Sequence, residues 1–158
     1  MAGFPGLCRD GDGTRRLDPA LRDDTLARIA ELGSRSLLVL PQRGELPPGA
    51  FEGLGDAAAR HGLTLTFLPI PDFGIPDAGA MARWRGLSPD LHSRIAIDGA
   101  AAVCCQAGAG RSGLIATLVL IEQGIDAAKA LSEVRRHHPQ AVETAGQERW
   151  LMDRRPQL

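Results

Sequence analysis

The sequence predicts a single α/β domain over residues 1–158, with a central, mostly parallel sheet flanked by helices. Short apolar runs alternate along the chain with segments in which apolar residues recur at the helical period. Hydrophobic residues make up 44% and charged residues 23% of the 158 residues, as is usual for a globular protein. No internal repeat, low-complexity tract or linker divides the chain.

The first half of the chain predicts two helices and two strands. Apolar residues recur near the helical period over residues 19–32, and Gly33 follows as a stop signal. The run SLLVL at 36–40 is too short for an independent helix and predicts a buried strand. A second helix is predicted over residues 50–60, and the alternating run LTLTFL at 63–68 predicts a second strand.

The second half predicts one loop, a third strand and four more helices. The segment PIPDFGIPD, residues 69–77, holds three prolines and one glycine and is predicted to be a defined loop. After this loop we expect a helix over residues 77–97 with a break near Gly86 and Pro89, a strand over 100–104, and helices over 112–123, 126–137 and 144–155.

The ten residues CCQAGAGRSG, 104–113, join the third predicted strand to the helix after it. A glycine-rich turn at a helix start presents backbone N–H groups and the positive end of the helix dipole to an anion. Arg111 adds a planar fork for two anionic oxygens, and the three glycines permit positive φ values and close ligand approach. The predicted oxyanion-binding loop consists of Gln106, Ala107, Gly108, Ala109, Gly110 and Arg111.

The two adjacent cysteines of this stretch have different predicted roles. A cysteine at the mouth of the loop meets several N–H dipoles and a permanent cation, and both favour the thiolate. Cys105 is therefore the predicted nucleophile, and its spacing from Arg111 indicates attack on a phosphate ester through a phosphocysteine intermediate. Cys104 alternates in direction with Cys105 and follows an apolar strand, so it is predicted to be a core residue.

This stretch resembles the signature loop of the cysteine-dependent protein tyrosine and dual-specificity phosphatases. In that family a cysteine, two variable residues, glycine, two variable residues, arginine, and serine or threonine follow in this order. The resemblance implies a protein tyrosine phosphatase-like fold, Cys105 as nucleophile, Arg111 as ligand of the phosphate and transition state, and Ser112 as the hydroxyl that helps the thiolate leave. The family places a loop-ordering histidine directly before its nucleophile, where this chain has Cys104.

Two further segments resemble parts of the same family. Asp72 corresponds to the general acid of its mobile loop, with Ile70 in the place of tryptophan; the alternative is an Asx turn in a proline-rich loop. Gln147 resembles the glutamine that positions the hydrolytic water, but Thr144 and Gln147 also match a capping box. The length and the PIPDFG pattern resemble the small dual-specificity group of the cyclin-dependent kinase inhibitor 3 type, and the resemblance covers residues 37–150.

These residues predict a metal-independent phosphomonoesterase that needs no cofactor and acts on a phosphorylated protein or peptide. The formal net charge of −1 argues against bulk affinity for nucleic acid or an anionic membrane surface. No apolar run is long enough to span a bilayer, and three cysteines fit a reducing compartment, so we expect a cytoplasmic protein. His61, His92, His137 and His138 are expected at surface helix ends.

Several alternatives stay open at this point. A phosphate-binding module without catalytic activity would keep the loop and lose the chemistry, and sulfur transfer or arsenate reduction also use a cysteine in an anion loop. The sequence does not distinguish phosphotyrosine, phosphoserine or phosphothreonine, and phosphoinositide substrates. It also leaves open the oligomeric state and whether Cys8 or Cys104 reacts with an oxidised Cys105.

Overall fold

The core of the computed structural model, which describes residues 1–155, is a parallel three-stranded sheet with the strand order β4-β3-β5. The strands are β3 (Ser36–Val39), β4 (Thr64–Phe67) and β5 (Ala102–Cys104). Leu38 of the central strand pairs with Thr66 on one side and Val103 on the other. All three predicted strands are confirmed, and because they run in one direction, their carboxyl ends lie at the same edge of the sheet.

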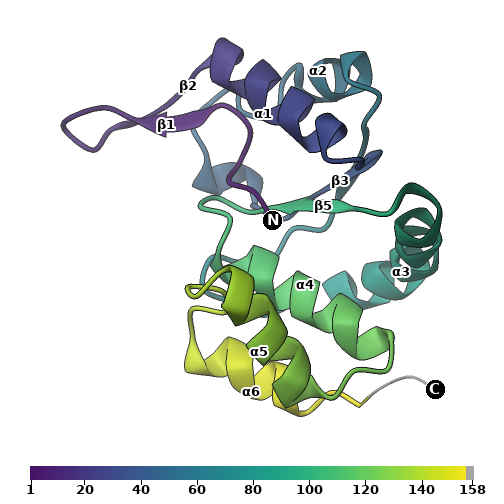
Figure 1. Ribbon diagram of the computed structural model, residues 1–158. Coiled ribbons are helices and arrows are strands. Elements are labelled where there is room, and N and C mark those ends of the chain that lie inside the picture. Colours follow the sequence, from purple (N-terminus) through teal and green to yellow (C-terminus); the bar gives the residue numbers. More distant parts are fainter. Residues whose placement is uncertain (156–158) are drawn as a thin grey trace.

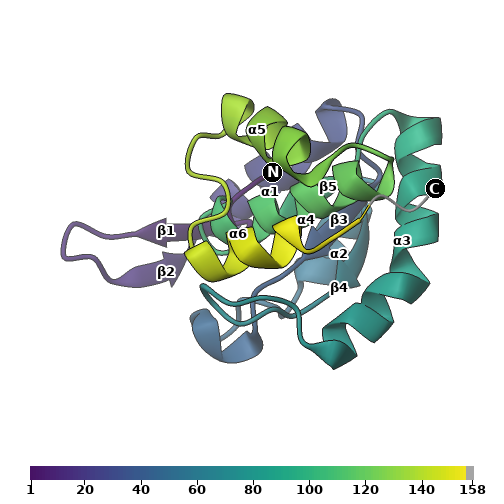
Figure 2. The ribbon, with the colours of Figure 1, turned by 90° about the horizontal axis from the view of Figure 1, so that it is seen from below.

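Helices cover both faces of this sheet, as Figures 1 and 2 show. One apolar core lies between the sheet and the first two helices, and the other lies between the sheet and the remaining four. The first layer holds α1 (Pro19–Glu31) and α2 (Leu54–Arg60). The second layer holds α3 (Ala78–Asp98), α4 (Gly110–Glu122), α5 (Ala127–His137) and α6 (Ala145–Met152). The predicted fold class, an α/β fold with a mostly parallel sheet flanked by helices, is therefore confirmed.

Several helices begin at side chains that cap their first turn. Asp18 accepts hydrogen bonds from the backbone of α1, and Asp77 does the same for α3. Asp126 caps α5, and Thr144 forms a capping box with Gln147 at the start of α6. Because each oxygen satisfies backbone N–H groups that have no partner within the helix, these positions determine where the helices start.

Three predicted boundaries are wrong. The helix expected from residue 50 begins at Leu54, because prolines at 47 and 48 and a left-handed Gly53 (φ 68°) keep the preceding segment in turns. The helix after the oxyanion loop begins at Gly110, two residues before the expected start, so that Arg111 lies in its first turn. The last helix ends at Met152 rather than near residue 155.

The expected break in the helix after the proline-rich loop is also wrong, since α3 continues through Pro89. Trp84 and Ser88 lie before the proline on one helix face, and His92 follows on the same face after it. The Trp84 Nε1 donates to Glu122 Oε1 (2.6 Å), the Ser88 hydroxyl donates to Oε2 (2.5 Å), and His92 Nε2 lies 3.0 Å from Oε2. These contacts hold both halves of α3 on α4, which offsets the hydrogen bond that a proline removes.

An antiparallel hairpin near the amino end was not predicted from the sequence. It consists of β1 (Leu7–Arg9) and β2 (Arg15–Leu17), with Cys8 opposite Arg16. Figure 1 shows it projecting from the body on the side where β5 ends and α4 begins. A short 3-10 helix, η1 (Arg43–Glu45), follows β3 on this side. Among residues 1–155 no helix is both long and apolar enough to cross a bilayer.

Replacing Glu122 with alanine is expected to lower the free energy of unfolding by roughly 2–4 kcal/mol, because three buried or half-buried polar groups of α3 lose their acceptor. Urea denaturation followed by tryptophan fluorescence measures this change. Glu133→Ala is the matched control: it removes an exposed ion pair with Arg136, and because exposed ion pairs contribute little to stability, a much smaller loss is expected. An equal loss in both variants would contradict the role given to Glu122.

Candidate active site

The predicted oxyanion loop connects the carboxyl end of β5 to the first turn of α4. The Cys105 Sγ accepts a hydrogen bond from the backbone N–H of Gly108 at 3.2 Å, and the cysteine is only 3% exposed. Gly108 has φ +84°, a left-handed conformation that glycine adopts without a steric penalty. Of the three glycines, which all permit positive φ values, only Gly108 has one; Gly110 and Gly113 lie in the regular first turns of α4.

The backbone of residues 2–4 hydrogen-bonds to the end of β5 and to this loop. Ala2 forms a parallel bridge with Cys104, its N–H donates to the carbonyl of Val103 (2.9 Å), and the Phe4 N–H donates to the Gln106 carbonyl (3.2 Å). A Cβ atom on Gly108 would lie 2.6 Å from the carbonyl carbon of Ala2, so the close approach requires glycine. These backbone contacts order the loop without the histidine that the resembled phosphatase family places directly before its nucleophile. This chain has Cys104 at that position.

Arg111 is buried at the end of the loop, with 2% of its side chain exposed, and it contacts two other segments of the chain. Its Nη1 lies 2.5 Å from the Glu45 Oε2 and donates to the Ile70 carbonyl at 2.9 Å. Its Nη2 lies 2.9 Å from the Asp72 Oδ1. The fold therefore brings two of the predicted catalytic residues, Arg111 and Asp72, into direct contact.

Asp72 lies in the loop after β4, on a tight turn closed by a hydrogen bond from the Gly74 N–H to the Pro71 carbonyl (2.9 Å). Its Oδ1 also accepts from the N–H of Phe73, at 3.2 Å. With 38% of its side chain exposed, Asp72 faces solvent as well as Arg111. An Asx turn would need the N–H of Gly74, which instead donates to the Pro71 carbonyl, so the Asx-turn alternative is not borne out. The contact of Asp72 with the predicted oxyanion loop is present.

Gln147 is fully buried and connects the start of α6 to the Asp72 loop. Its Oε1 accepts from the N–H groups of Glu143 (2.9 Å) and Thr144 (3.3 Å), and its Nε2 donates to the Gly74 carbonyl (3.0 Å). The Thr144 hydroxyl donates to the carbonyl of Phe73 (3.4 Å). The capping box is confirmed, and the same two side chains anchor the acid loop. The expected role of Gln147 in positioning water stays a prediction.

Two more side chains lie where the loop enters α4. The Ser112 hydroxyl is buried and has no hydrogen-bond partner among residues 1–155, so it can still donate a hydrogen bond to an anion beside it. The Glu143 carboxylate rests against Gly110, and a Cβ at that glycine would collide with it. An acidic side chain thus lies directly beside the predicted phosphate-binding residues.

Sequence reasoning missed two acidic residues of this site, Glu45 and Glu143. Glu45 had a detectable signal, because it stands a few residues beyond the carboxyl end of a predicted parallel strand, where ligand-binding loops gather. Its second carboxylate oxygen, Oε1, is buried and has no hydrogen-bond partner in the described residues. Glu143 had no such signal, because only the packing of α6 against α4 brings it to Gly110.

Cys104 and Cys105 face opposite sides of the sheet, as their alternation predicted. Cys104 is fully buried in the core beneath α1 and α2, and Cys105 belongs to the core on the other face. Burial, followed by the neighbouring Cys105, raises the pKa of the Cys104 thiol well above its usual range. The prediction of Cys104 as a core residue is confirmed.

One of the four histidines departs from the expected surface helix end. His61, His137 and His138 lie at the ends of α2 and α5, but His92 lies within α3 against Glu122. Within the described part of the chain, no three His, Cys, Asp or Glu side chains come together as a metal site requires.

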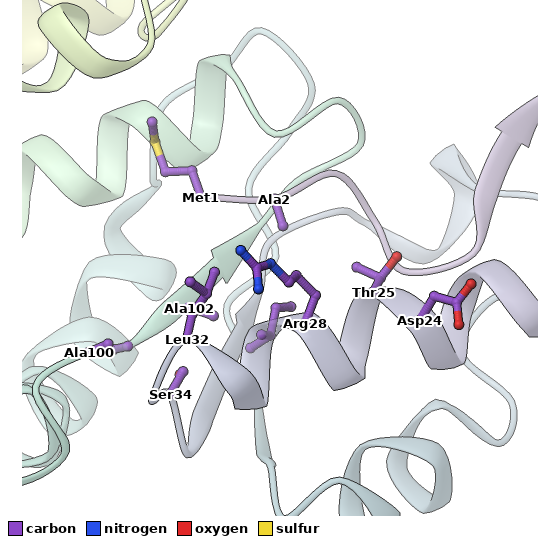
Figure 3. A pocket seen from close by; sticks show the side chains of 11 residues that line it. Met1, Ala2, Asp24, Thr25, Arg28, Leu32, Ser34, Ala100 and Ala102 are labelled. Atoms are coloured by element: carbon purple, nitrogen blue, oxygen red, sulfur yellow. The ribbon is translucent and has the colours of Figure 1, made fainter.

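A cavity of about 550 Å³ lies apart from these residues, between α1, the amino end of β5 and the first two residues of the chain (Figure 3). Thr25, Arg28 and Ala102 are among the residues that line it, and none of the predicted catalytic residues does. The candidate active site is therefore defined by the chemistry at the carboxyl end of β5 rather than by this cavity.

Comparisons with known proteins agree with this fold. No protein-family model matches the chain. The crystal structure of Tk-PTP in the active form has a TM-score of 0.67 and 28% sequence identity, and the alignment covers 84% of this chain and 86% of that one. Kinase associated phosphatase with its catalytic-site cysteine replaced by serine has a TM-score of 0.73 and 24% identity, over 94% of this chain and 80% of that one.

In fold and in sequence the chain is similar to the superfamily of protein tyrosine and dual-specificity phosphatases. Within that superfamily it is similar to cyclin-dependent kinase inhibitor 3 over nearly its whole length. The mouse protein (Mus musculus) is 28% identical over 158 residues, which cover 98% of this chain and 73% of that protein. The resemblance to that group expected from the sequence is thereby confirmed.

Glu45→Gln is expected to lower the free energy of unfolding by roughly 2–3 kcal/mol, because it removes one of the two carboxylates that compensate the buried Arg111 charge. Thermal and urea denaturation measure this loss. Glu52→Gln, in the turn segment between η1 and α2, is the control for removing an acidic charge nearby without touching Arg111. Equal stability of the two variants would show that Glu45 does not hold the guanidinium.

At neutral pH, iodoacetamide is expected to modify Cys105 and leave Cys104 unmodified, since alkylation requires a thiolate and burial keeps Cys104 in its thiol form. Peptide mass spectrometry after a time course measures modification at each cysteine. Inorganic phosphate should protect Cys105 and have no effect on Cys8 in the hairpin. Modification of Cys104 in the folded protein would contradict the packing described for β5.

Proposed function

We propose that this chain hydrolyses phosphate monoesters on phosphorylated proteins through a phosphocysteine intermediate, without a metal or cofactor. One observation supports this above the others. The Cys105 sulfur lies in a backbone N–H loop that ends in the buried Arg111, and Asp72 reaches the same guanidinium at 2.9 Å. A nucleophile, an oxyanion ligand and a proton donor are the groups that this reaction requires.

In the first step the Cys105 thiolate attacks phosphorus as the bond from phosphorus to the substrate oxygen breaks. The Arg111 guanidinium and the loop N–H groups hold the phosphoryl oxygens, so their contribution is positioning and electrostatic stabilisation. Asp72 gives its proton to the departing oxygen, which leaves poorly as an anion.

In the second step water attacks the phosphorus of phosphocysteine and the sulfur–phosphorus bond breaks. Asp72, now a carboxylate, accepts the water proton, and Cys105 departs as a thiolate that the Ser112 hydroxyl stabilises. Gln147 is proposed to orient the water. Its full set of contacts with the Gly74 carbonyl and the start of α6 supports a second contribution, which is to hold the acid loop near the phosphate.

A phosphate-binding module without turnover is the alternative from another class of protein. Cys104, in the place where the resembled family has a loop-ordering histidine, is the feature that keeps this alternative open. The Glu143 carboxylate beside Gly110 opposes binding of a dianion in either case and does not distinguish the two. An inactive module would bind inorganic phosphate or vanadate, leave aryl phosphates intact, and react slowly with iodoacetamide at Cys105. Sulfur transfer or arsenate reduction would instead proceed at an unchanged rate in Asp72→Asn.

Cys105→Ser is expected to reduce hydrolysis of para-nitrophenyl phosphate by a factor of about 10³ or more, because a hydroxyl is a far weaker nucleophile at neutral pH. The variant should still bind vanadate, since the loop N–H groups and Arg111 remain. Stopped assays and vanadate titration measure the two properties. Retained turnover would overturn the assignment of the nucleophile.

Asp72→Asn is expected to lower kcat by a factor of about 10²–10³ with phenyl phosphate and by less with para-nitrophenyl phosphate, because the better leaving group needs less protonation. Kinetics with both esters measure this difference. Asp90→Asn, an exposed α3 residue paired with Arg94, is the control. An equal loss with the two esters would contradict a role in proton donation.

A further inference from the structure

We propose that Arg9, Arg15 and Arg43 form a basic rim beside the active site that recognises an acidic residue next to the phosphorylated residue of the substrate. This inference rests on the proposed function, because it names the class of phosphoprotein that the site accepts. All three side chains are exposed, and none forms an ion pair with an acidic residue among residues 1–155. Arg15 lies beside the loop of Cys105, Arg9 stands opposite it in the hairpin, and Arg43 lies two residues before Glu45.

Two of these arginines lie opposite one another in the unpredicted hairpin. Arg9 of β1 pairs in register with Arg15 of β2, so both side chains project from the same hairpin face. Like charges directly opposite in an antiparallel pair repel one another and destabilise the hairpin. A bound anion relieves this repulsion, so the arginine pair is more stable with an anionic ligand bound than in the isolated protein.

The same hairpin face turns toward the body of the protein. Leu7 and Leu17 share this face by the register of the pairing, and both pack against the core beneath α1 and α2. The opposite face carries Arg16, which is neutralised by Asp10 at 2.7 Å and Asp18 at 3.4 Å. The arginines without acidic partners thus lie on the side that faces the molecule.

Arg15 is connected directly to the active-site loop. Its Nη1 donates to the Glu45 carbonyl at 3.0 Å, and the Gln106 Nε2 donates to the same oxygen at 3.4 Å. Two donors on one acceptor lie side by side, so the Arg15 guanidinium is a neighbour of the residue that follows the nucleophile. The carboxylate of Glu45 contacts Arg111, the predicted phosphate-binding residue. Glu45 therefore connects Arg15, through its backbone carbonyl, to Arg111, through its side chain.

Arg43 extends the rim along η1. Its guanidinium lies 5.0 Å from the centre of the Phe51 ring, which holds a cation in place while leaving its hydrogen-bond donors exposed. Because Glu45 of the same short helix is committed to Arg111, it does not neutralise Arg43. A carboxylate or a second phosphate on the substrate chain would complement this charge, and an acidic phosphopeptide is the partner that we infer.

We expect the basic rim to make the enzyme prefer phosphopeptides that carry acidic residues next to the phosphorylated residue. Two phosphopeptides of equal length, one with aspartates and one with asparagines beside the phosphorylated residue, provide the comparison. The wild-type kcat/KM should favour the acidic peptide by roughly three- to tenfold, and the double variant Arg9→Ala/Arg15→Ala should reduce this ratio to near one. The preference should also shrink when sodium chloride rises from about 20 to about 500 mM.

Arg16→Ala is the matched control, since it removes the same charge from the same strand on the opposite hairpin face and should keep the preference. Arg9→Ala alone is a second probe, because the Arg9 guanidinium hydrogen-bonds, within residues 1–155, to the Gly13 carbonyl of its own hairpin and its loss leaves the support of Glu45 intact. Equal kcat/KM for the two peptides in the wild type, or an equal loss of preference in Arg16→Ala, would overturn the inference.

Binding to the Cys105→Ser protein separates this inference from the proposed function. Fluorescence anisotropy with the same two phosphopeptides measures the ratio of Kd values without turnover. If the wild type hydrolyses neither peptide but binds the acidic one more tightly through Arg9 and Arg15, the proposed catalysis is contradicted. The proposed recognition of acidic residues by the basic rim is then still supported. If vesicles that contain a phosphoinositide bind through these arginines while both peptides bind equally, the inferred peptide partner is wrong.

Discussion

The buried guanidinium of Arg111 is the group on which the arrangement of the site depends. A cation that is 2% exposed is strongly destabilising unless other groups compensate it, and here Glu45, Asp72 and the Ile70 carbonyl do so. These partners come from the segments that follow β3 and β4, whereas Arg111 itself follows β5. Because the strands are parallel and adjacent in the order β4-β3-β5, their carboxyl ends converge, and one side chain holds all three segments together.

The same interaction connects ligand binding to the acid loop. In the proposed reaction the phosphoryl oxygens take up donors of Arg111, and Asp72 is then free to approach the leaving group. The loop itself stays close because Gln147 and Thr144 hold it by the carbonyls of Gly74 and Phe73, not by the carboxylate. The backbone anchor and the Asp72 side chain are thus separate, which allows the proposed acid to act without rearrangement of α6.

The oxyanion loop owes its order to backbone contacts. Residues 2–4 run alongside the end of β5 and bond to Val103 and Gln106, and Gly108 permits their close approach. This chain has Cys104 in the position where the resembled family places a histidine before its nucleophile. The Cys104 side chain packs in the core between the sheet and helices α1 and α2. The two cysteines therefore divide their roles by strand alternation: Cys104 packs the core and Cys105 meets the loop N–H groups.

The sequence by itself determined the order of the three parallel strands and six α-helices, and it indicated the predicted oxyanion loop and its cysteine, because apolar periodicity, capping residues and the spacing of Cys105 from Arg111 are local properties of the chain. It also indicated Asp72 through a loop pattern. Only the tertiary structure decided that Glu45 compensates Arg111, that Glu143 lies against Gly110, and that α3 passes through Pro89 while bonded to Glu122. These contacts join residues that are distant in the sequence, and their geometry follows from the direction of the strands and the packing of helices on the sheet.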